Sequence, residues 1–523
     1  MVCQHAFKAA MGFLASRLPT RIFPFMRDLL KQPLWRPEDL GQPMPDSRHA
    51  VSVCLPTWLD NVGYEEGETR VIQALQTGYP RFVYHPLCRA VFSECERRFA
   101  GADEACLAWP SERVAKRFVA WLHQRTGVTP KTHKGWLPGF FASSYPRAVA
   151  SEAKAYWQHS GEGISSRRAA AALGLAPEPL PAGCVDATAA KTRIRQHLGE
   201  IAGLPESDVF LFPIGMTAIF VMQRVLQRLY PGRPSVQFGF PYVDTLKVQE
   251  KFGPGVKFLP HASAADLAAL QGEFRQQPLS GIFTEFPSNP LLISPDLAAL
   301  SRLARQHGVP LIVDDTIATV VNVDLLGVAD VICTSLTKSY SGVGDVTGGA
   351  LWLNPHSPLH GVLRAALVAE YEDLLWDEDV SLLAHHGTSF VQRVHETSAN
   401  AQALAAYLAH HPKVAQVYHP SRQTPELYRA FQRPGGGAGA MLSIILRDEA
   451  QAAPRFFNAL RCCKGPNLGM DYTLVCPFTI LAHYTELDWA ERCGVSRYLM
   501  RVAVGREPQA ELLSRFGEAL DQA

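Results

Sequence analysis

Two short segments of this chain carry residue types that together support amine chemistry. The first, Val313-Asp314-Asp315-Thr316, follows an apolar run. The second, residues 334–339, follows another apolar run and includes Lys338, which hydroxyl-bearing side chains flank. A carboxylate at the end of a buried strand can face a site at the sheet edge. A lysine amine can form an imine with an aldehyde.

One acid and one amine of this kind are what pyridoxal 5'-phosphate (PLP) requires. Asp314 would keep the pyridine nitrogen protonated, and Lys338 would hold the aldehyde and move protons. Each residue alone has a simpler interpretation, because an Asp after a strand is often a turn former and a Lys beside hydroxyls is usually solvated. Their occurrence together, within alternating strand and helix patterns, favours the catalytic interpretation.

Short apolar runs recur from residue 209 onward and predict strands. These runs are 209–212, 235–238, 256–259, 281–284, 310–313, 330–333 and 349–353. Helical patterns separate most of them, at 216–230, 246–252 and 296–306. This alternation predicts an α/β fold with a mostly parallel central sheet and helices on both faces. Ligands of such sheets lie beyond the carboxyl ends of the strands, where Asp314 falls.

The remainder of the chain has a different pattern of apolar and polar residues. After about residue 385 the pattern predicts a smaller α+β unit, with helices at 391–408, 452–460 and 509–520 and strands at 414–418 and 440–446. Between residues 60 and 200 only two helical patterns are clear, at 87–99 and 111–124. We therefore expect an N-terminal arm (1–60), an extension that contributes to the cofactor domain (61–204), a cofactor domain (205–385) and a C-terminal domain (386–523).

Composition narrows the class of protein. The 523 residues carry a formal net charge of +1, which does not favour a nucleic-acid partner. The 11 cysteines contain no CxxC pair, which favours reduced thiols in a cytoplasmic protein over disulfides or a zinc site, and we expect no metal. No apolar run reaches the roughly 18–20 residues of a membrane span. The basic stretch before Asp28 is expected to be a packing arm, with an organellar targeting segment as the alternative.

Two further segments could bind the anionic and aromatic parts of the cofactor. Gly215 and Met216 begin a helix after a strand, where free amides suit a phosphate, although an ordinary turn would look the same. Ser335 and Thr337 could add hydroxyls to that phosphate. Phe238 ends another predicted strand and could stack on the pyridine ring, although core packing is the usual fate of Phe.

Polar residues in apolar surroundings point to the substrate. Asn289 lies in the loop 285–290 and could donate to a phenolic oxygen, or could serve only as a turn residue. Arg501 interrupts the apolar segment 499–505. A buried arginine is costly unless it is paired, so it predicts either a carboxylate clamp or a structural salt bridge.

These motifs, in this order, resemble the Cys/Met-metabolism PLP-dependent enzymes, the cystathionine γ-synthase/β-lyase family. The matching segments are Ile214 to Thr217, Glu285 to Pro290, Val313 to Thr316, Ser335 to Lys338 and Arg501 to Gly505. The sequence of residues 238–245 and 161–167 is similar to that of the fungal-type cystathionine γ-synthases. The resemblance implies a fold-type-I PLP-dependent transferase in which Lys338 carries the cofactor and Arg501 binds the substrate carboxylate.

Several residues depart from the family pattern. The stacking tyrosine of the family falls on Phe238, so Tyr242 is expected to supply the hydroxyl, and the family's Ser-Leu-Gly near the substrate begins here with Asn467. The family's Tyr-x-Arg, which a neighbouring subunit lends to the phosphate, has two candidates. Distance along the chain favours Ser165-Ser166-Arg167, whereas Tyr79-Pro80-Arg81 matches in letters.

The resemblance implies γ-replacement of an O-acyl-L-homoserine, succinyl or acetyl, with L-cysteine to give cystathionine. Lys338 would remove the α and then the β proton. Alternatives within the class are a cystathionine γ- or β-lyase and an O-acylhomoserine sulfhydrylase. A catalytically silent assembly subunit would be expected to lose Lys338 or Asp314, and both are present. The expected partners are amino-acid substrates and identical subunits, in a homodimer or homotetramer.

Overall fold

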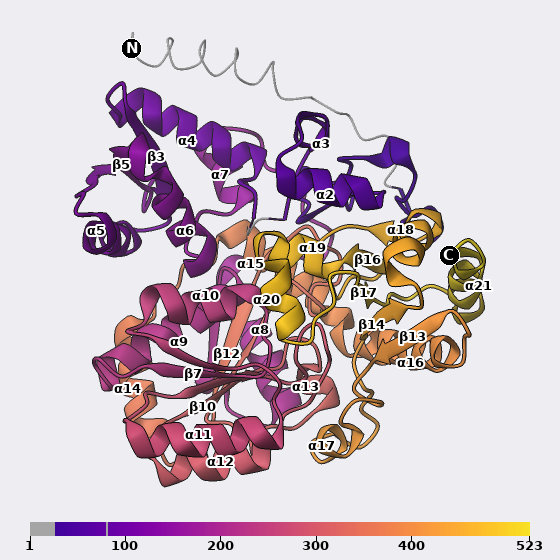
Figure 1. Ribbon diagram of the computed structural model, residues 1–523. Helices are drawn as coiled ribbons and strands as arrows, with labels where there is room; N and C mark the ends of the chain where they lie inside the picture. The colour runs from indigo at the N-terminus through magenta and orange to yellow at the C-terminus, as the bar shows by residue number, and fades with distance from the viewer. Residues whose placement is uncertain (1–26, 80–81) are drawn as a thin grey trace.

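The computed structural model describes residues 27–79 and 82–523, which form four β-sheets with helices around them (Figure 1). The basic stretch within residues 1–26 and Arg81 lie outside the described residues. Among the residues described, no helix is both long and apolar enough to span a lipid bilayer.

The largest sheet confirms all seven strands that the sequence predicts between residues 209 and 353. Its order is β6-β12-β11-β10-β9-β7-β8. The strands are β6 (Val209–Phe212), β7 (Ser235–Phe238), β8 (Val256–Leu259), β9 (Ile282–Glu285), β10 (Leu311–Asp314), β11 (Val331–Thr334) and β12 (Gly349–Leu353). Strands β11 to β8 pair in parallel, and β12 pairs antiparallel with both of its neighbours. The carboxyl ends of the parallel strands therefore share one edge.

Both faces of this sheet are buried, as the near-continuous apolar runs require. Along β10, Ile312 faces one hydrophobic cluster, and Leu311 and Val313 face another. Helices α9 (Gly215–Leu229), α10 (Val243–Phe252) and α14 (His360–Glu370) contribute to the first cluster. Helices α8 (Ala187–Ala202), α11 (Ala264–Gln276), α12 (Leu297–Gln306) and α15 (Asp377–His386) contribute to the second. The prediction of helices on both faces is confirmed, although α8, α11, α14 and α15 were not predicted individually.

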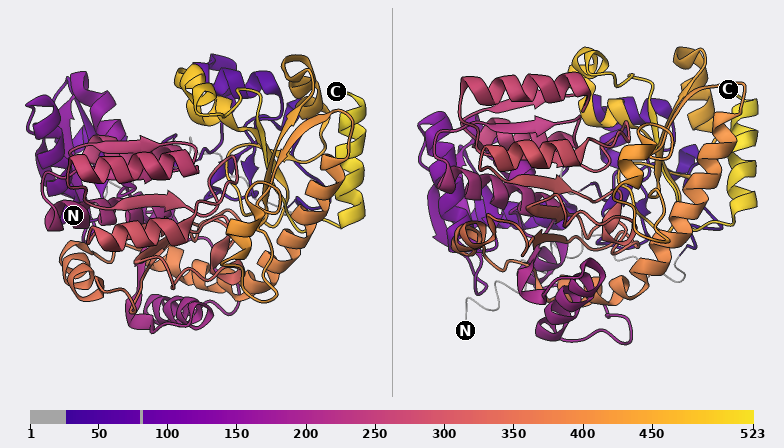
Figure 2. Two further views of the ribbon diagram at one scale, coloured as in Figure 1. Left: turned by 60° about the horizontal axis from the view of Figure 1, so that its bottom comes forward. Right: turned by 90° about the horizontal axis from the view of Figure 1, so that it is seen from below.

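A second sheet of five strands lies in the C-terminal part of the chain, in the order β13-β14-β17-β16-β15 (Figure 2). The strands are β13 (Val414–Tyr418), β14 (Met441–Leu446), β15 (Cys463–Lys464), β16 (Leu474–Pro477) and β17 (Met500–Ala503). The helices α16 (Phe390–Ala409), α18 (Glu449–Ala459) and α21 (Gln509–Asp521) pack on it. Arg501 lies in the central strand β17, opposite Ser443 and Cys476.

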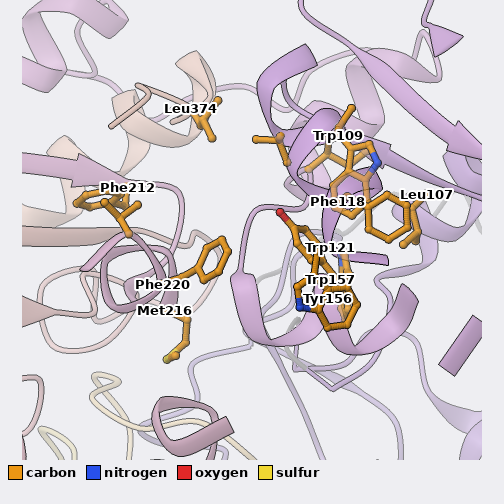
Figure 3. Packing of buried hydrophobic residues seen from close by; sticks show 14 of the residues in the cluster. Leu107, Trp109, Phe118, Trp121, Tyr156, Trp157, Phe212, Met216, Phe220 and Leu374 are labelled. Atoms are coloured by element: carbon orange, nitrogen blue, oxygen red, sulfur yellow. The ribbon is translucent and has the colours of Figure 1, made fainter. Parts of the chain in front are cut away.

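A third, antiparallel sheet of three strands was not predicted from the sequence. It consists of β3 (Glu104–Trp109), β4 (Lys131–Lys134) and β5 (Phe141–Pro146), and the helices around it are α4 (Pro86–Phe99), α5 (Glu112–Thr126), α6 (Ala150–Ser160) and α7 (Ser166–Ala172). Figure 3 shows its aromatic core, where Trp109, Phe118 and Tyr156 come close together while Phe220 of α9 faces them. This unit therefore packs directly on the helix that begins at Gly215.

The N-terminal segment 27–79 packs on the C-terminal sheet. Its elements are β1 (Pro43–Met44), β2 (Ser52–Val53), α2 (Trp58–Glu66) and α3 (Thr69–Ala74). The amide of Leu55 donates to the carbonyl of Lys464 (2.9 Å), and the amide of Trp58 donates to Asn458 (2.8 Å). The segment then continues to Tyr79, which brings it to the pocket described next.

Candidate active site

One pocket lies where the carboxyl ends of β9, β10 and β11 meet the C-terminal sheet and the N-terminal segment. The large sheet, the turn before α9, the loop 465–473 and strand β17 all contribute side chains. The lining residues that bear on chemistry are Tyr79, Gly215, Met216, Tyr242, Glu285, Asn289, Asp314, Thr316, Ser335, Lys338, Asn467, Phe478 and Arg501. Nine of the twelve residues that the sequence singled out thus lie around one cavity.

Lys338 is buried, and its amine points into this pocket. The Nζ donates to the hydroxyl of Tyr79 (2.8 Å) and to Oδ1 of Asn467, and it lies 4.6 Å from the centre of the Tyr79 ring. Asn467 adopts φ = +120°, a conformation that non-glycine residues rarely accept. The loop thus carries backbone strain at the residue that touches the amine.

Asp314 and Glu285 end adjacent parallel strands and face each other in register. Burial raises the pKa of both carboxyl groups, and the charge of Asp314 raises the pKa of Glu285 further. Asp314 accepts the amide of Thr316 (2.9 Å), which opposes its upward shift. Glu285 accepts the amides of Tyr242 (2.6 Å) and Asn289 (3.1 Å). Glu285 thus fixes two loops of the pocket, while Asp314 is the carboxylate available to a ligand cation.

The start of α9 forms a cradle for an anion. Ile214 is extended, and the helix of 15 residues begins at Gly215, so its first amides lack partners within the helix. Gly215 and Met216, which carry two of these amides, line the pocket. A Cβ placed on Gly215 would lie 2.8 Å from the Cβ of Ser335, so only glycine permits this close approach. The hydroxyl-bearing Ser335 therefore lies beside the free amides of α9.

Arg501 reaches the pocket from the C-terminal sheet. Its guanidinium donates to Oδ1 of Asn289 (3.3 Å) and to the carbonyl of Asn467 (2.9 Å), and it lies 4.9 Å from the centre of the Phe478 ring. No carboxylate pairs with Arg501 among the ion pairs of residues 27–79 and 82–523. Its neutral partners leave its charge available to the carboxylate of a ligand.

Three of the residues that the sequence proposed for the cofactor do not line this pocket, namely Phe238, Thr337 and Arg167. Phe238 does not line the pocket, because its side chain joins Val236 on the strand face that packs in the core. Thr337 is buried, and its hydroxyl is bonded to both the amide (3.1 Å) and the carbonyl (3.2 Å) of Gly348. The side chain of Tyr242, by contrast, does line the pocket.

Arg167 does not reach the pocket of Lys338 within this chain. It lines a second cavity and pairs with Asp379 (3.1 Å) and Asp345 (3.8 Å). Distance along the sequence favoured Arg167 over the Tyr79 motif, yet Tyr79 is the residue that touches Lys338. The inserted three-stranded sheet separates the motif from Gly215 in sequence without separating them in space. The expected reach of Arg167 into a neighbouring subunit stays a prediction.

Sequence reasoning missed some pocket residues. Phe82 and Phe478 carry no polar pattern that marks them, and Glu285 and Thr316 were recognised only as parts of motifs. Tyr79 did carry a signal in the letters Tyr-Pro-Arg.

These groups fit a cofactor that bears both a phosphate and an amine-reactive carbonyl. The glycine-dependent cradle at α9 suits the phosphate, Lys338 supplies the amine and Asp314 supplies a carboxylate for a protonated ring nitrogen. Fold and site together define a PLP-dependent enzyme of the doubly wound α/β class.

Comparison with known proteins identifies the family. The chain belongs to the Cys/Met metabolism PLP-dependent enzymes, whose family model matches residues 188–521, and these enzymes use PLP. The model of the fungal trans-sulfuration enzyme N-terminal domain matches residues 87–165, which include the three-stranded sheet.

Similar proteins carry more than one activity in their names. A cystathionine gamma-synthase of Neurospora crassa is 34% identical, with 93% of this chain and 99% of that protein covered. An alanine racemase of Aspergillus violaceofuscus is 29% identical, with 92% and 96% covered. The crystal structure of cystathionine gamma synthase from Xanthomonas oryzae pv. oryzae has a TM-score of 0.56 at 24% identity over 64% of this chain and 85% of that chain, and it confirms the fold.

Proposed function

We propose that this protein is a cystathionine γ-synthase, which replaces the acyl group of an O-acyl-L-homoserine with the sulfur of L-cysteine. The observation that carries the proposal is the placement of Lys338, Asp314 and Arg501 around one pocket. The Neurospora crassa relative, whose length this chain covers almost completely, supports the choice within the family. Transsulfuration within methionine biosynthesis is the corresponding metabolic role.

Each proposed role follows from where the side chain lies. Gly215, Met216 and Ser335 would hold the phosphate, and Asp314 would hold the ring nitrogen. Bound PLP supplies an electron sink for the charge that develops on the substrate. Arg501 would bind the α-carboxylate of the substrate, with Asn467 and Asn289 fixing the guanidinium.

Lys338 would move the protons of the reaction. Its Nζ would take the proton from Cα of the bound amino acid and then one from Cβ, which allows the acyl group to leave from Cγ. The hydroxyl of Tyr79 and the amide oxygen of Asn467 hold this amine at the pocket wall. Tyr242 lines the pocket and is proposed as the residue that covers the ring face. The thiol of L-cysteine would then add at Cγ.

The test combines a spectrum with an assay on the purified protein loaded with PLP. We expect an absorption band near the visible range and formation of cystathionine from O-acetyl- or O-succinyl-L-homoserine with L-cysteine, detected by mass spectrometry. Lys338→Ala should abolish both, whereas Lys257→Ala, which removes a lysine on β8 away from the pocket, should keep both. No band in the wild-type protein with excess PLP would overturn the proposal.

The same preparation separates the alternatives. Release of 2-oxobutanoate or pyruvate from cystathionine would indicate a γ- or β-lyase. Homocysteine formed from sulfide would indicate a sulfhydrylase. Because one relative is named an alanine racemase, racemisation of L-alanine is measured as well. The elution volume of the native protein tests the proposed homodimer or homotetramer.

A further inference from the structure

Arg393, in the first turn of α16, hydrogen-bonds to the backbone of the loop that carries Lys338. Its guanidinium donates to the carbonyls of Ser339 and Tyr340 (both 3.0 Å), which directly follow the lysine. A Cβ on Gly342, which adopts φ = +70°, would collide with this guanidinium. The arginine therefore lies flat against the loop backbone, and its side chain is only 3% exposed.

The partner of Arg393 belongs to a second pocket loop. Its Nε donates to Oδ1 of Asp471 (2.8 Å), in the loop 465–473 that carries Asn467. The amide of Asp471 donates to the carbonyl of Gly342 (2.7 Å). A Cβ on Gly469 would lie 2.6 Å from the nitrogen of Ser339, so the two loops touch along their backbones. Asp471 and Arg393 thus join two loops. The first is residues 338–342, here called the lysine loop, and the second is residues 465–473, here called the asparagine loop.

The same carboxylate also meets the segment that follows Arg501. The amide of Arg506 donates to the carbonyl of Asp471 (2.7 Å), and its Nη1 lies 3.4 Å from Oδ1 of Asp471. The guanidinium of Arg501 itself donates to the carbonyl of Asn467 (2.9 Å). One cluster, in which Arg393 is buried and Asp471 and Arg506 are partly exposed, therefore connects the chain segments that carry Lys338, Asn467 and Arg501.

Fold stability alone does not require such a cluster. Burying a guanidinium carries a desolvation penalty that its ion pair and hydrogen bonds roughly offset, so a buried salt bridge contributes little net stability. The rigid, planar guanidinium of arginine instead fixes the positions of its partners relative to one another, because it binds two carbonyls and a carboxylate at once. The carbonyls that it fixes belong to the two residues after Lys338.

We propose that Arg393 is a positioning residue for Lys338. Acting through Asp471, it sets the lysine loop against the asparagine loop and so holds the Nζ of Lys338 at Asn467 and Tyr79. This inference rests on the proposed function, in which Lys338 moves the protons. It assigns Arg393 no contact with substrate or cofactor.

The test uses Arg393→Gln and Arg393→Lys, with Arg515→Gln as the matched control. Arg515 is another arginine with an almost fully buried side chain (4% exposed), but it pairs with Glu511 on α21 and does not line the pocket. Three experiments are made: steady-state kinetics for kcat and KM, a pH titration of the absorption band of the PLP-bound protein, and acylation of Lys338 in the PLP-free protein followed by peptide mass mapping. The melting temperature reports folding in each variant.

For Arg393→Gln we expect kcat to fall about tenfold to a hundredfold with KM nearly unchanged, because the proton-transfer geometry is misplaced. The band should titrate at a different pH, and the acylation rate of Lys338 should change. Arg393→Lys should recover part of kcat, because it keeps the charge opposite Asp471 but loses the planar fork. Arg515→Gln should match the wild type in kcat, titration and labelling.

Asp471→Asn provides the second arm if Arg393→Gln does not fold. Its side chain is 26% exposed, and the change keeps the hydrogen bond that its backbone amide donates to the carbonyl of Gly342. Wild-type titration and wild-type labelling in a folded variant of either residue would overturn the inference. If the wild-type protein shows no band, the proposed function fails, and the labelling of Lys338 still decides whether Arg393 positions the lysine.

Discussion

The Nζ of Lys338 lies 2.8 Å from the hydroxyl of Tyr79, although 259 positions separate the two residues along the chain. The tyrosine comes from the N-terminal segment, and the lysine follows a central strand of the large sheet. The N-terminal segment is therefore part of the pocket wall as well as a covering of the C-terminal sheet. This contact leads to the first prediction.

Tyr79→Phe removes the hydroxyl but keeps the ring that lies against the amine. A hydrogen bond to a charged group contributes roughly 1.5–3 kcal/mol, so we expect kcat to fall about tenfold to a hundredfold. The pH profile of kcat should shift as well, because the hydroxyl contacts the amine that is proposed to move the protons. Tyr64→Phe, a buried tyrosine of α2 outside the pocket, is the control. Equal kcat and pH profile in Tyr79→Phe and the wild type would contradict the prediction.

Asp314→Asn keeps the shape of the side chain and removes its charge. If Asp314 holds the protonated ring nitrogen, kcat should fall about a hundredfold or more, as for other preorganised electrostatic groups. Asp314→Glu should recover part of the loss. The measurement is steady-state kinetics with the PLP content determined in parallel. A kcat of Asp314→Asn within a few-fold of the wild type would remove Asp314 from its proposed role.

Arg501→Lys keeps a positive charge in the pocket but loses the two-pronged geometry that a carboxylate favours. We expect KM for the acyl-homoserine to rise by roughly a hundredfold, with a smaller effect on kcat, because the lost contact is made in the ground state and in the transition state alike. Substrate titrations at fixed cysteine concentration measure both constants. The exposed Arg455, on α18, gives the control Arg455→Lys. An unchanged KM would assign Arg501 a purely structural role.

Asp315 predicts a dependence of stability on pH. Burial, and then the charge of Asp314, raise its pKa to about 8, against about 4 in an unfolded chain. Between these values the folded protein keeps a proton that the unfolded chain releases. The folded state is thus favoured most at low pH, and this contribution is lost as the pH rises from about 4 to about 8.

Asp315→Asn cannot ionise, so its melting temperature should fall less steeply between about pH 5 and pH 8 than that of the wild type. At the upper end of this range the variant should melt higher by at least about 2 °C. Thermal unfolding at several pH values measures the difference. Asp324→Asn, an exposed carboxylate in an ion pair with Arg433, is the control. Parallel curves for Asp315→Asn and the wild type would contradict the assignment.

Local patterns in the sequence determined all seven strands of the largest sheet but only part of the C-terminal sheet, where β15 and β16 were not predicted. The seven apolar runs between residues 209 and 353 all form strands of one sheet. Six of these strands are almost completely buried, and the edge strand β8 is partly buried. Nine of the twelve proposed site residues line one pocket. Seven of them end or follow a strand of the large sheet, whereas Asn467 and Arg501 come from the C-terminal part of the chain. Residue order along the chain was sufficient to predict that edge of the sheet.

Only the tertiary structure decided which distant residues complete the site. Tyr79 reaches Lys338 because the N-terminal segment folds back over the C-terminal sheet, a path that no periodicity encodes. Phe238 faces the core instead of the pocket, because the two-residue period of its strand sets its side (the strand itself was predicted correctly). Arg167 pairs with Asp379 for the same kind of reason, since a partner 212 positions away is fixed by packing and not by sequence distance.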